Sequence, residues 1–313
     1  MSISILDEHV GYLALPHRLD LYRAAVAKLV GRGDHVIDVG CGTAVLGLLC
    51  LEAGASRVDA IDSTAAIELA RQSLTQAGHA QKCNFIRASS FQTTLAERAD
   101  VIICDHVGHF GFDYGLIEVL ADARQRFLKP AGQIIPGRLK LFVSAVESRD
   151  ARDKANAWRN PGIPGEFHWI HEYSVNSKHV LNLRREELLA DPAELCCIDL
   201  RIDNPEFFSW SVTLTVDRDG VLHGLGGWFE CELADGIWMT NSPLSDRSIG
   251  RGNAFLPIAE PLPVRARDRL DVTIMARPAS GMIAWTLNHP ATGKRVRHST
   301  WQGEVFDPVQ LAF

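Results

Sequence analysis

Residues 104–115 read CDHVGHFGFDYG and gather ionisable side chains between glycines. Histidines and carboxylates are the residue types that general acid–base chemistry uses, and glycine lets the backbone run close to a ligand. A solvated polar turn has the same composition. The stretch is therefore a candidate catalytic loop, with these candidate residues: Asp105, His106, His109, Asp113 and Tyr114.

A second stretch that could bind a ligand is the turn DVGCGTA. It follows a β-branched strand pattern and precedes a helical pattern. Its amides and the following helix N-terminus can bind the polar part of a ligand, and Gly40 and Gly42 allow close approach. Val45 stands where a dinucleotide fingerprint has its third glycine, whereas Asp62 ends the next strand, where a carboxylate binds ribose hydroxyls. The pattern favours a nucleoside-containing ligand without a pyrophosphate, and a nicotinamide dehydrogenase is the second hypothesis.

Alternating strands and helices position both stretches in the first half of the chain. The periodicity predicts strands at 35–40, 57–62, 83–89 and 99–105, and helices at 18–30, 44–54, 64–78 and 115–132. Such alternation is typical of an α/β parallel sheet with helices on both faces. The candidate loop then follows the fourth strand, at the edge where open α/β sheets bind ligands.

The hydrophobic pattern changes near Pro136, where apolar and polar residues begin to alternate with the two-residue period of a β-strand. Antiparallel strands are predicted at 139–146, 208–216, 221–233 and 270–276. We therefore expect one domain over 1–135 and a second, β-rich domain over 136–313. Residues 150–195 are mixed and aromatic, which indicates an inserted arm. Its HWIH segment, with His168 and His171, has no carboxylate or cysteine at metal-ligand spacing, so we expect packing there and no metal.

Composition limits the classes of partner. The 313 residues have a formal net charge of −6 and a pI near 6.1, which argues against nucleic acid or an anionic membrane as the main partner. The N-terminal MSISILDEHV lacks the parts of a signal peptide, and the seven cysteines include no C-x-x-C pair. We expect a cytoplasmic protein with reduced thiols.

The segment HVIDVGCGTAVLGLLCLEAGASRVDAID resembles the S-adenosylmethionine-binding motif of class I methyltransferases, and among them most resembles the protein arginine methyltransferases. The likeness continues in ADVIICDHVGHFGFDYG and ADARQRFLKPAGQIIPGRLKLF, and extends to GWFECEL and TNSPLS. It implies S-adenosylmethionine as cofactor, a Rossmann-like sheet followed by an antiparallel β-barrel, and a methyl acceptor between them. It also implies a homodimer formed through the arm.

The resemblance assigns the cofactor-binding residues by position. Arg18 would pair with the methionine carboxylate, and Asp38 would support the glycine turn from beneath. The other implied contacts are His9 as a cover, Gly40 and Gly42 at the methionine half, Asp62 and Ser63 at the ribose, and Ser89 or Ser90 at the adenine edge.

Two family signatures are altered. Where the family has two glutamates that hold the substrate guanidinium, this chain has Asp105 and Tyr114, with Asp113 one residue out of register; where the family has Thr-His-Trp, it reads SIGRGNAF. We therefore expect a methyltransferase that modifies nitrogen or oxygen of a small polar metabolite, with Asp105 orienting the acceptor and His109 or His106 as base. The alternatives are arginine methylation, in which Asp105 and Asp113 hold the guanidinium, and a silent scaffold that only binds the cofactor.

Overall fold

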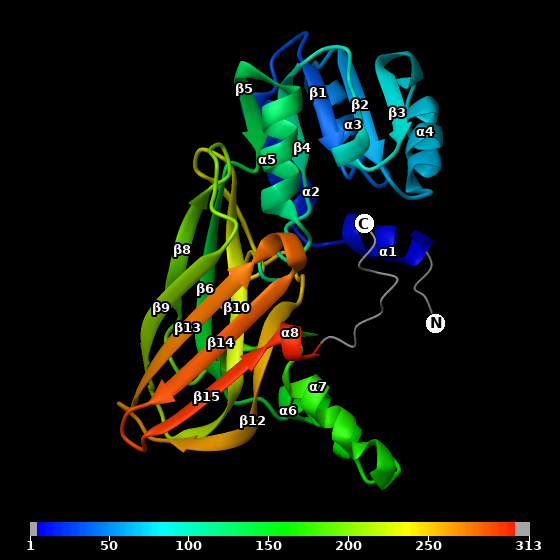
Figure 1. Ribbon diagram of the computed structural model, residues 1–313. Helices are drawn as coiled ribbons and strands as arrows, with labels where there is room; N and C mark the ends of the chain where they lie inside the picture. Colours follow the sequence, from blue (N-terminus) through cyan, green and yellow to red (C-terminus); the bar gives the residue numbers. More distant parts are fainter. Residues whose placement is uncertain (1–4, 304–313) are drawn as a thin grey trace.

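The first half of the chain forms a five-stranded parallel sheet with the strand order β3-β2-β1-β4-β5 (Figure 1). The computed structural model describes residues 5–303. The strands are β1 (His35–Val39), β2 (Arg57–Asp62), β3 (Cys83–Arg87), β4 (Ala99–Cys104) and β5 (Leu128–Ile135). The central strand β1 is buried along its whole length, which is what a continuous apolar run between two helical layers requires.

Helices are present where the alternation predicts them: α2 (Arg18–Leu29), α3 (Val45–Ala53), α4 (Ala66–Gln76) and α5 (Leu116–Phe127). A further helix, α1 (Ile5–Leu13), precedes them. In α4 the residues Ile67, Ala70 and Leu74 are buried at helical spacing against the sheet. α1 lies across the edge at which the parallel strands end (Figure 1).

The prediction of one helix over 115–132 is wrong at its C-terminal end. Helix α5 stops at Phe127, and Leu128 begins β5, which pairs in parallel with β4. Pro130 has no amide proton for a helix and would clash with the preceding turn. A register shift opposite Asp100 accommodates the residues that the sequence pattern assigned to the helix.

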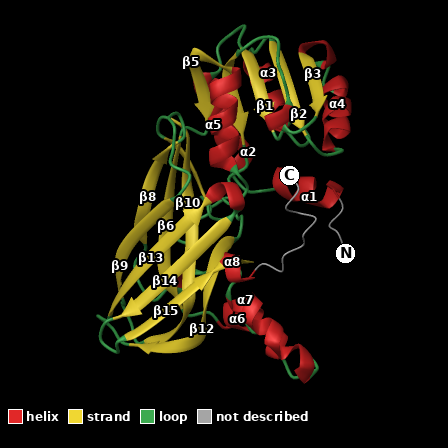
Figure 2. Ribbon diagram, in the orientation of Figure 1, coloured by secondary structure: helices red, strands yellow, loops and turns green. Residues whose placement is uncertain are grey.

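Two antiparallel sheets build the second domain as a barrel (Figure 2). One has the order β7-β12-β10-β6-β8, with β11 paired to β10, and the other has the order β15-β14-β13-β9. Their bounds are β6 (Arg138–Val146), β7 (His179–Leu181), β8 (Ala193–Asp199), β9 (Phe208–Thr215), β10 (Gly220–Ala234), β11 (Ile237–Thr240), β12 (Asn253–Val264), β13 (Arg269–Arg277), β14 (Met282–His289) and β15 (Lys294–Ser299). A short helix α8 (Thr300–Gly303) follows.

An arm leaves the barrel between β6 and β8 and carries the helices α6 (Arg149–Ala155) and α7 (His171–Val175) (Figure 1). Ser148 caps α6 by accepting a hydrogen bond from the Ala151 amide. Three large aromatic side chains of the arm, Trp158, Phe167 and Trp169, are 39%, 49% and 64% exposed. The arm thus presents apolar surface that the barrel does not cover.

The loop of residues 104–115 contacts both domains. Phe110 and Phe112 are fully buried, and Phe112 packs against Trp210 of the barrel with ring centroids 6.4 Å apart. Asn241 donates a hydrogen bond to the His109 carbonyl at 2.9 Å. The loop is therefore held from the barrel side while it lies at the strand ends of the parallel sheet.

Across residues 5–303, the helices are too short or too polar to cross a bilayer.

Candidate active site

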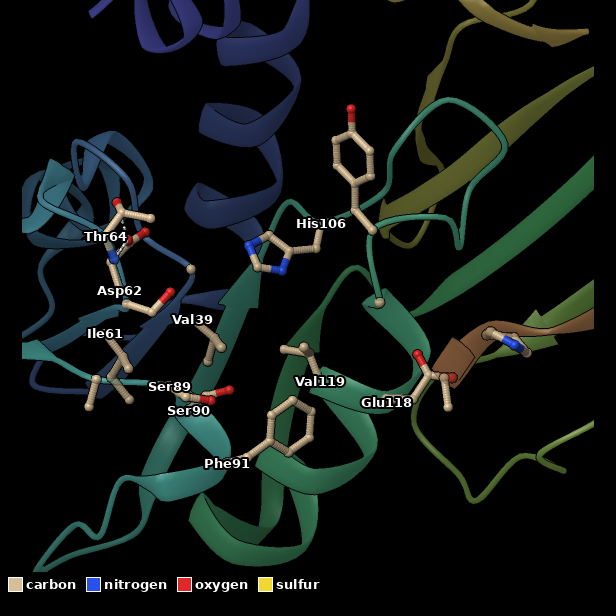
Figure 3. Close-up of a pocket in the computed structure, with 17 residues that line it drawn as sticks. Val39, Ile61, Asp62, Thr64, Ser89, Ser90, Phe91, His106, Glu118 and Val119 are labelled. Atoms are coloured by element: carbon tan, nitrogen blue, oxygen red, sulfur yellow. Dashed lines mark hydrogen bonds between the residues drawn. The ribbon is translucent and has the colours of Figure 1, made fainter. Parts of the chain in front are cut away.

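Two adjoining cavities open at the carboxyl ends of β1, β2 and β4, with volumes of about 580 and 450 Å³. Strand order reverses between β1 and β4, which is where open α/β sheets bind ligands. The residues that line both cavities are Gly40, Asp62, Thr64, His106 and Tyr114. In the close-up, His106 lies between Asp62 on one side and Glu118 on the other (Figure 3).

Glycine is required at the turn after β1 for two reasons. Gly40 and Gly42 have φ angles of +64° and +53°, which disfavour side chains. A Cβ at Gly40 would also lie 1.9 Å from His106 Nε2, and a Cβ at Gly42 would lie 2.6 Å from His9 Cε1. The turn therefore brings bare backbone to the cavity beneath two imidazole rings.

Asp62 holds the turn while it faces the cavities. Its Oδ2 accepts a hydrogen bond from the Gly42 amide at 2.8 Å, and its Oδ1 accepts from the Thr64 amide at 2.8 Å. A carboxylate oxygen has lone pairs to spare after such bonds. Asp62 is thus fixed in orientation and still able to accept hydrogen bonds from ligand hydroxyls.

The larger cavity is lined by both hydroxyl-bearing and apolar side chains. Ser63, Ser89 and Ser90 line it together with Phe91 and Val119. Pro278 and Ala279 of the barrel close it. This lining suits a flat heterocycle, because apolar side chains can contact its faces while hydroxyls contact its edge.

Asp105 lies at the centre of a buried ionic cluster. Its Oδ2 accepts from Arg18 Nε at 2.6 Å and from Arg251 Nη2 at 3.3 Å, and its Oδ1 accepts from the Tyr22 hydroxyl at 2.9 Å. Burial alone would raise the pKa of Asp105, but Arg251 and Arg18 outweigh it and the pKa is lowered. The geometry argues against Asp105 as a free clamp for an acceptor, because the chain's own cations already occupy it.

Arg18 has unused hydrogen-bonding capacity. While its Nε contacts Asp105, its Nη1 is buried and has no hydrogen-bond partner. The residue lines the smaller cavity, and its guanidinium lies over the Tyr22 ring at 5.3 Å. An unpaired buried N–H of this kind costs free energy unless a ligand satisfies it, and a carboxylate is its natural partner.

Asp113 and Asp38 line neither cavity. Asp113 Oδ1 accepts from the amides of His109 and Phe110, both at 2.9 Å, and its Oδ2 pairs with Lys178. Asp38 accepts from the Gly47 amide at 2.8 Å, and burial raises its pKa to about 7. Both carboxyls therefore shape loops, Asp113 within the candidate catalytic loop and Asp38 beneath the glycine turn.

The two loop histidines lie in different places. His106 projects into the cavities over Gly40, and burial lowers its pKa. His109 instead lines a separate cavity of about 450 Å³ between α1 and the barrel. Its Nδ1 lies 3.0 Å from the Gly252 carbonyl oxygen and its Nε2 lies 3.1 Å from the Tyr114 hydroxyl.

Sequence reasoning missed several residues of this site, among them Glu8, Tyr12, Tyr22, Glu118 and Arg251. Arg251 stands in the SIGRGNAF stretch that replaces the family signature, and the sequence does not reveal its contact with Asp105. Glu118 lines the larger cavity with a buried Oε2 that has no partner, and burial raises its pKa. Tyr12 and Tyr22 occupy helical positions that read as ordinary packing residues.

Family comparisons agree with this geometry. A family model described as a methyltransferase domain matches residues 36–132, and one described as an arginine methyltransferase oligomerization subdomain matches residues 138–283. Protein arginine N-methyltransferase 1 of Dictyostelium discoideum is 26% identical over 69% of this chain and 64% of its own length. Protein arginine N-methyltransferase 6 of Xenopus laevis is 26% identical over 63% of this chain and 61% of its own length. The chain thus spans less than two thirds of these relatives.

Solved structures share the fold over nearly the whole chain. The Trypanosoma brucei PRMT1 enzyme–prozyme heterotetrameric complex with AdoHcy aligns with a TM-score of 0.81 and 21% identity, covering 93% of this chain and 96% of that one. Arabidopsis thaliana protein arginine methyltransferase 10 aligns with a TM-score of 0.76 and 20% identity, covering 90% and 94%. In fold and in sequence, this chain resembles the class I methyltransferases, and across both of its domains it resembles the protein arginine methyltransferase family.

Proposed function

We propose that the chain binds S-adenosylmethionine at the strand ends and transfers its methyl group to an acceptor held between the two domains. The observation that carries the proposal is the convergence of Arg18, Asp62 and the glycine turn on one cavity system, with Arg18 Nη1 buried and unpaired. A solved structure of similar fold is described as a complex with AdoHcy, which supports the same cofactor class.

The side chains fit this cofactor part by part. Arg18 Nη1 would bind the methionine carboxylate, and Asp62 would accept hydrogen bonds from the ribose hydroxyls. Ser89, Ser90 and Val119 line the larger cavity, which suits adenine. When bound, the cofactor supplies an electrophilic methyl group on a sulfonium. The chain's own residues orient the acceptor and take its proton.

For the acceptor, the curated relatives support a guanidino nitrogen of arginine, since they are named protein arginine N-methyltransferases. In this chain the carboxylate that would meet a guanidinium has to come from outside the loop, because Asp105 and Asp113 are both paired with the chain's own cations. Glu8 of α1 lines both the smaller cavity and the barrel-side cavity. We therefore propose Glu8, which faces both the cofactor side and the barrel side, as the carboxylate that an arginine acceptor would meet.

A small polar metabolite is the second candidate, and the loop geometry favours it. The position of the family's second glutamate is Tyr114, whose hydroxyl bonds to His109. A neutral hydroxyl and a neutral imidazole suit an acceptor that carries a transferable proton and no permanent charge. Such an acceptor does not depend on Glu8.

An acceptor screen with methyl-labelled S-adenosylmethionine separates these candidates. Arginine-containing peptides, free arginine and a metabolite extract are supplied in parallel, and each is repeated with Glu8→Gln. Labelled arginine that is lost in Glu8→Gln supports the first candidate, whereas a labelled metabolite that is indifferent to Glu8→Gln supports the second. Cofactor binding without S-adenosylhomocysteine formation from any acceptor would contradict an enzyme and support a scaffold.

A further inference from the structure

Two side chains of the loop, His109 and Tyr114, are hydrogen-bonded to each other beside the cofactor cavities, and Tyr12 of α1 lies next to them. His109 Nδ1 lies 3.0 Å from the Gly252 carbonyl, which can only accept, so Nδ1 carries the proton. In the neutral ring Nε2 is then the acceptor, and the Tyr114 hydroxyl, 3.1 Å away, donates to it. The direction of this hydrogen bond follows from the partners and not from the residue types alone.

Tyr12 of the N-terminal helix α1 is a neighbour of Tyr114. Burial, together with the neighbouring Tyr114, raises the pKa of Tyr12 to about 12, and a hydrogen bond to Tyr114 contributes to the rise. Tyr12 therefore stays protonated near pH 7. The donation that the structure shows runs from Tyr114 to His109.

The positions of these groups decide which one meets the acceptor. Tyr114 lines both cofactor cavities, whereas His109 lines neither of them and faces the barrel-side cavity. Tyr12 lines the smaller cofactor cavity and the barrel-side cavity. A proton released at the cofactor side reaches the Tyr114 oxygen first, and His109 lies behind it.

We propose that Tyr114 and His109 form a proton relay for methyl transfer, with Tyr114 as the catalytic residue and His109 as the terminal base. The inference rests on the proposed methyltransferase function. The acceptor atom forms a bond to the methyl carbon as the sulfur–methyl bond breaks and leaves its electron pair on sulfur. The acceptor's proton passes to the Tyr114 oxygen while the Tyr114 proton passes to His109 Nε2, so the step ends with an imidazolium.

The surroundings of His109 suit this role. Burial lowers its pKa, while the Gly252 carbonyl and Asp113 act in the opposite direction, and Lys178 and Arg251 add to the lowering. The ring is therefore neutral near pH 7 and free to take a proton. After transfer, the Nδ1 proton still bonds to Gly252 and Asp113 remains nearby to offset the new charge.

Nuclear magnetic resonance of ¹⁵N-histidine-labelled protein tests the geometry without an acceptor. We expect neutral His109 to carry its proton on Nδ1. In Tyr114→Phe the His109 pKa should rise, because a hydrogen bond donated to Nε2 stabilises the neutral ring. Tyr173→Phe, which removes a hydroxyl from the arm, should leave that pKa unchanged. A proton on Nε2, or an unchanged His109 pKa in Tyr114→Phe, would overturn the relay.

Kinetics and calorimetry separate the relay from the proposed function. With whichever of free arginine, an arginine-rich peptide or an extract component is methylated, Tyr114→Phe and His109→Gln should each lower kcat by about 10²-fold or more. The double variant should lose little beyond either single one. S-adenosylmethionine affinity should stay within about threefold of the wild type in both. Full kcat in either variant refutes the relay alone, whereas wild-type protein that fails to bind the cofactor refutes the proposed function.

Discussion

Asp105 shows how a residue expected to bind the acceptor can serve the fold. Its side chain is 9% exposed and contacts Arg18, Arg251 and Tyr22. Removing one member of a buried ion cluster leaves the others charged and unpaired. The carboxylate is therefore a structural link between α2, the loop and the segment before β12.

We predict that Asp105→Asn lowers the free energy of unfolding by about 3 to 5 kcal/mol, since two buried guanidinium groups lose their counter-ion. Urea unfolding measures the loss. Asp246→Asn, an exposed carboxyl of the barrel, serves as the matched control and should change little. An Asp105→Asn protein as stable as the wild type would show that Asp105 is not a structural link.

Acid pH should remove the difference in unfolding free energy between the wild type and Asp105→Asn. The folded-state pKa of Asp105 lies below its ordinary value of 3.8, so its stabilisation is complete above that value and is lost as the pH falls through the folded pKa. The gap in unfolding free energy between wild type and Asp105→Asn should thus be constant from pH 7 to about pH 5 and shrink below pH 4. A gap that widens on acidification would reverse the assigned sign.

Asp62 is the residue that we expect to bind the ribose of the cofactor. Asp62→Ala should weaken S-adenosylmethionine binding by about 10-fold to 100-fold, which is the loss of a hydrogen bond to a charged group. Isothermal calorimetry measures it, with Asp246→Ala as the control. Undiminished affinity in Asp62→Ala would remove the ribose assignment.

At the level of elements, the glycine turn after β1 combines backbone strain with close approach. Gly40 and Gly78 both have positive φ angles, +64° and +80°, but only at Gly40 would a Cβ meet another group, the His106 ring. Alanine should cost about 1 to 2 kcal/mol of stability at either position. Only Gly40→Ala should also reduce S-adenosylmethionine affinity, by tenfold or more, because His106 is pushed into the cavity.

Calorimetry on both alanine variants decides this point. Equal affinities in Gly40→Ala and Gly78→Ala, at equal loss of stability, would mean that the turn matters for the fold and not for the ligand.

Local sequence patterns predict most of the helices and strands. For example, β2 and the start of α5 follow from hydrophobic periodicity and from the glycines that bound these elements. The partners of Asp105 were not predictable, because Arg18, Tyr22 and Arg251 lie 87, 83 and 146 residues away in the chain. Nor could sequence reasoning separate His106 from His109, since the Gly252 carbonyl and Asn241, which lie more than 130 residues away in the chain, help to fix where the second ring lies.

At the level of the whole molecule, the exposed arm predicts self-association. A family model described as an oligomerization subdomain matches residues 138–283, which include the arm. We predict a homodimer by size-exclusion with light scattering, and a monomer for Trp169→Glu. Ile202→Glu changes a similarly exposed apolar side chain outside the arm and should remain dimeric. A wild-type monomer at micromolar concentration would mean that the arm has another role.

The central claim is that the cavity at the ends of β1, β2 and β4 binds S-adenosylmethionine. Isothermal calorimetry of the wild-type protein with S-adenosylmethionine, S-adenosylhomocysteine and NADH tests it most directly. We predict one site per chain with micromolar affinity for the first two ligands and no measurable heat with NADH. Binding of NADH without binding of S-adenosylmethionine would contradict the account and favour a nicotinamide-dependent enzyme.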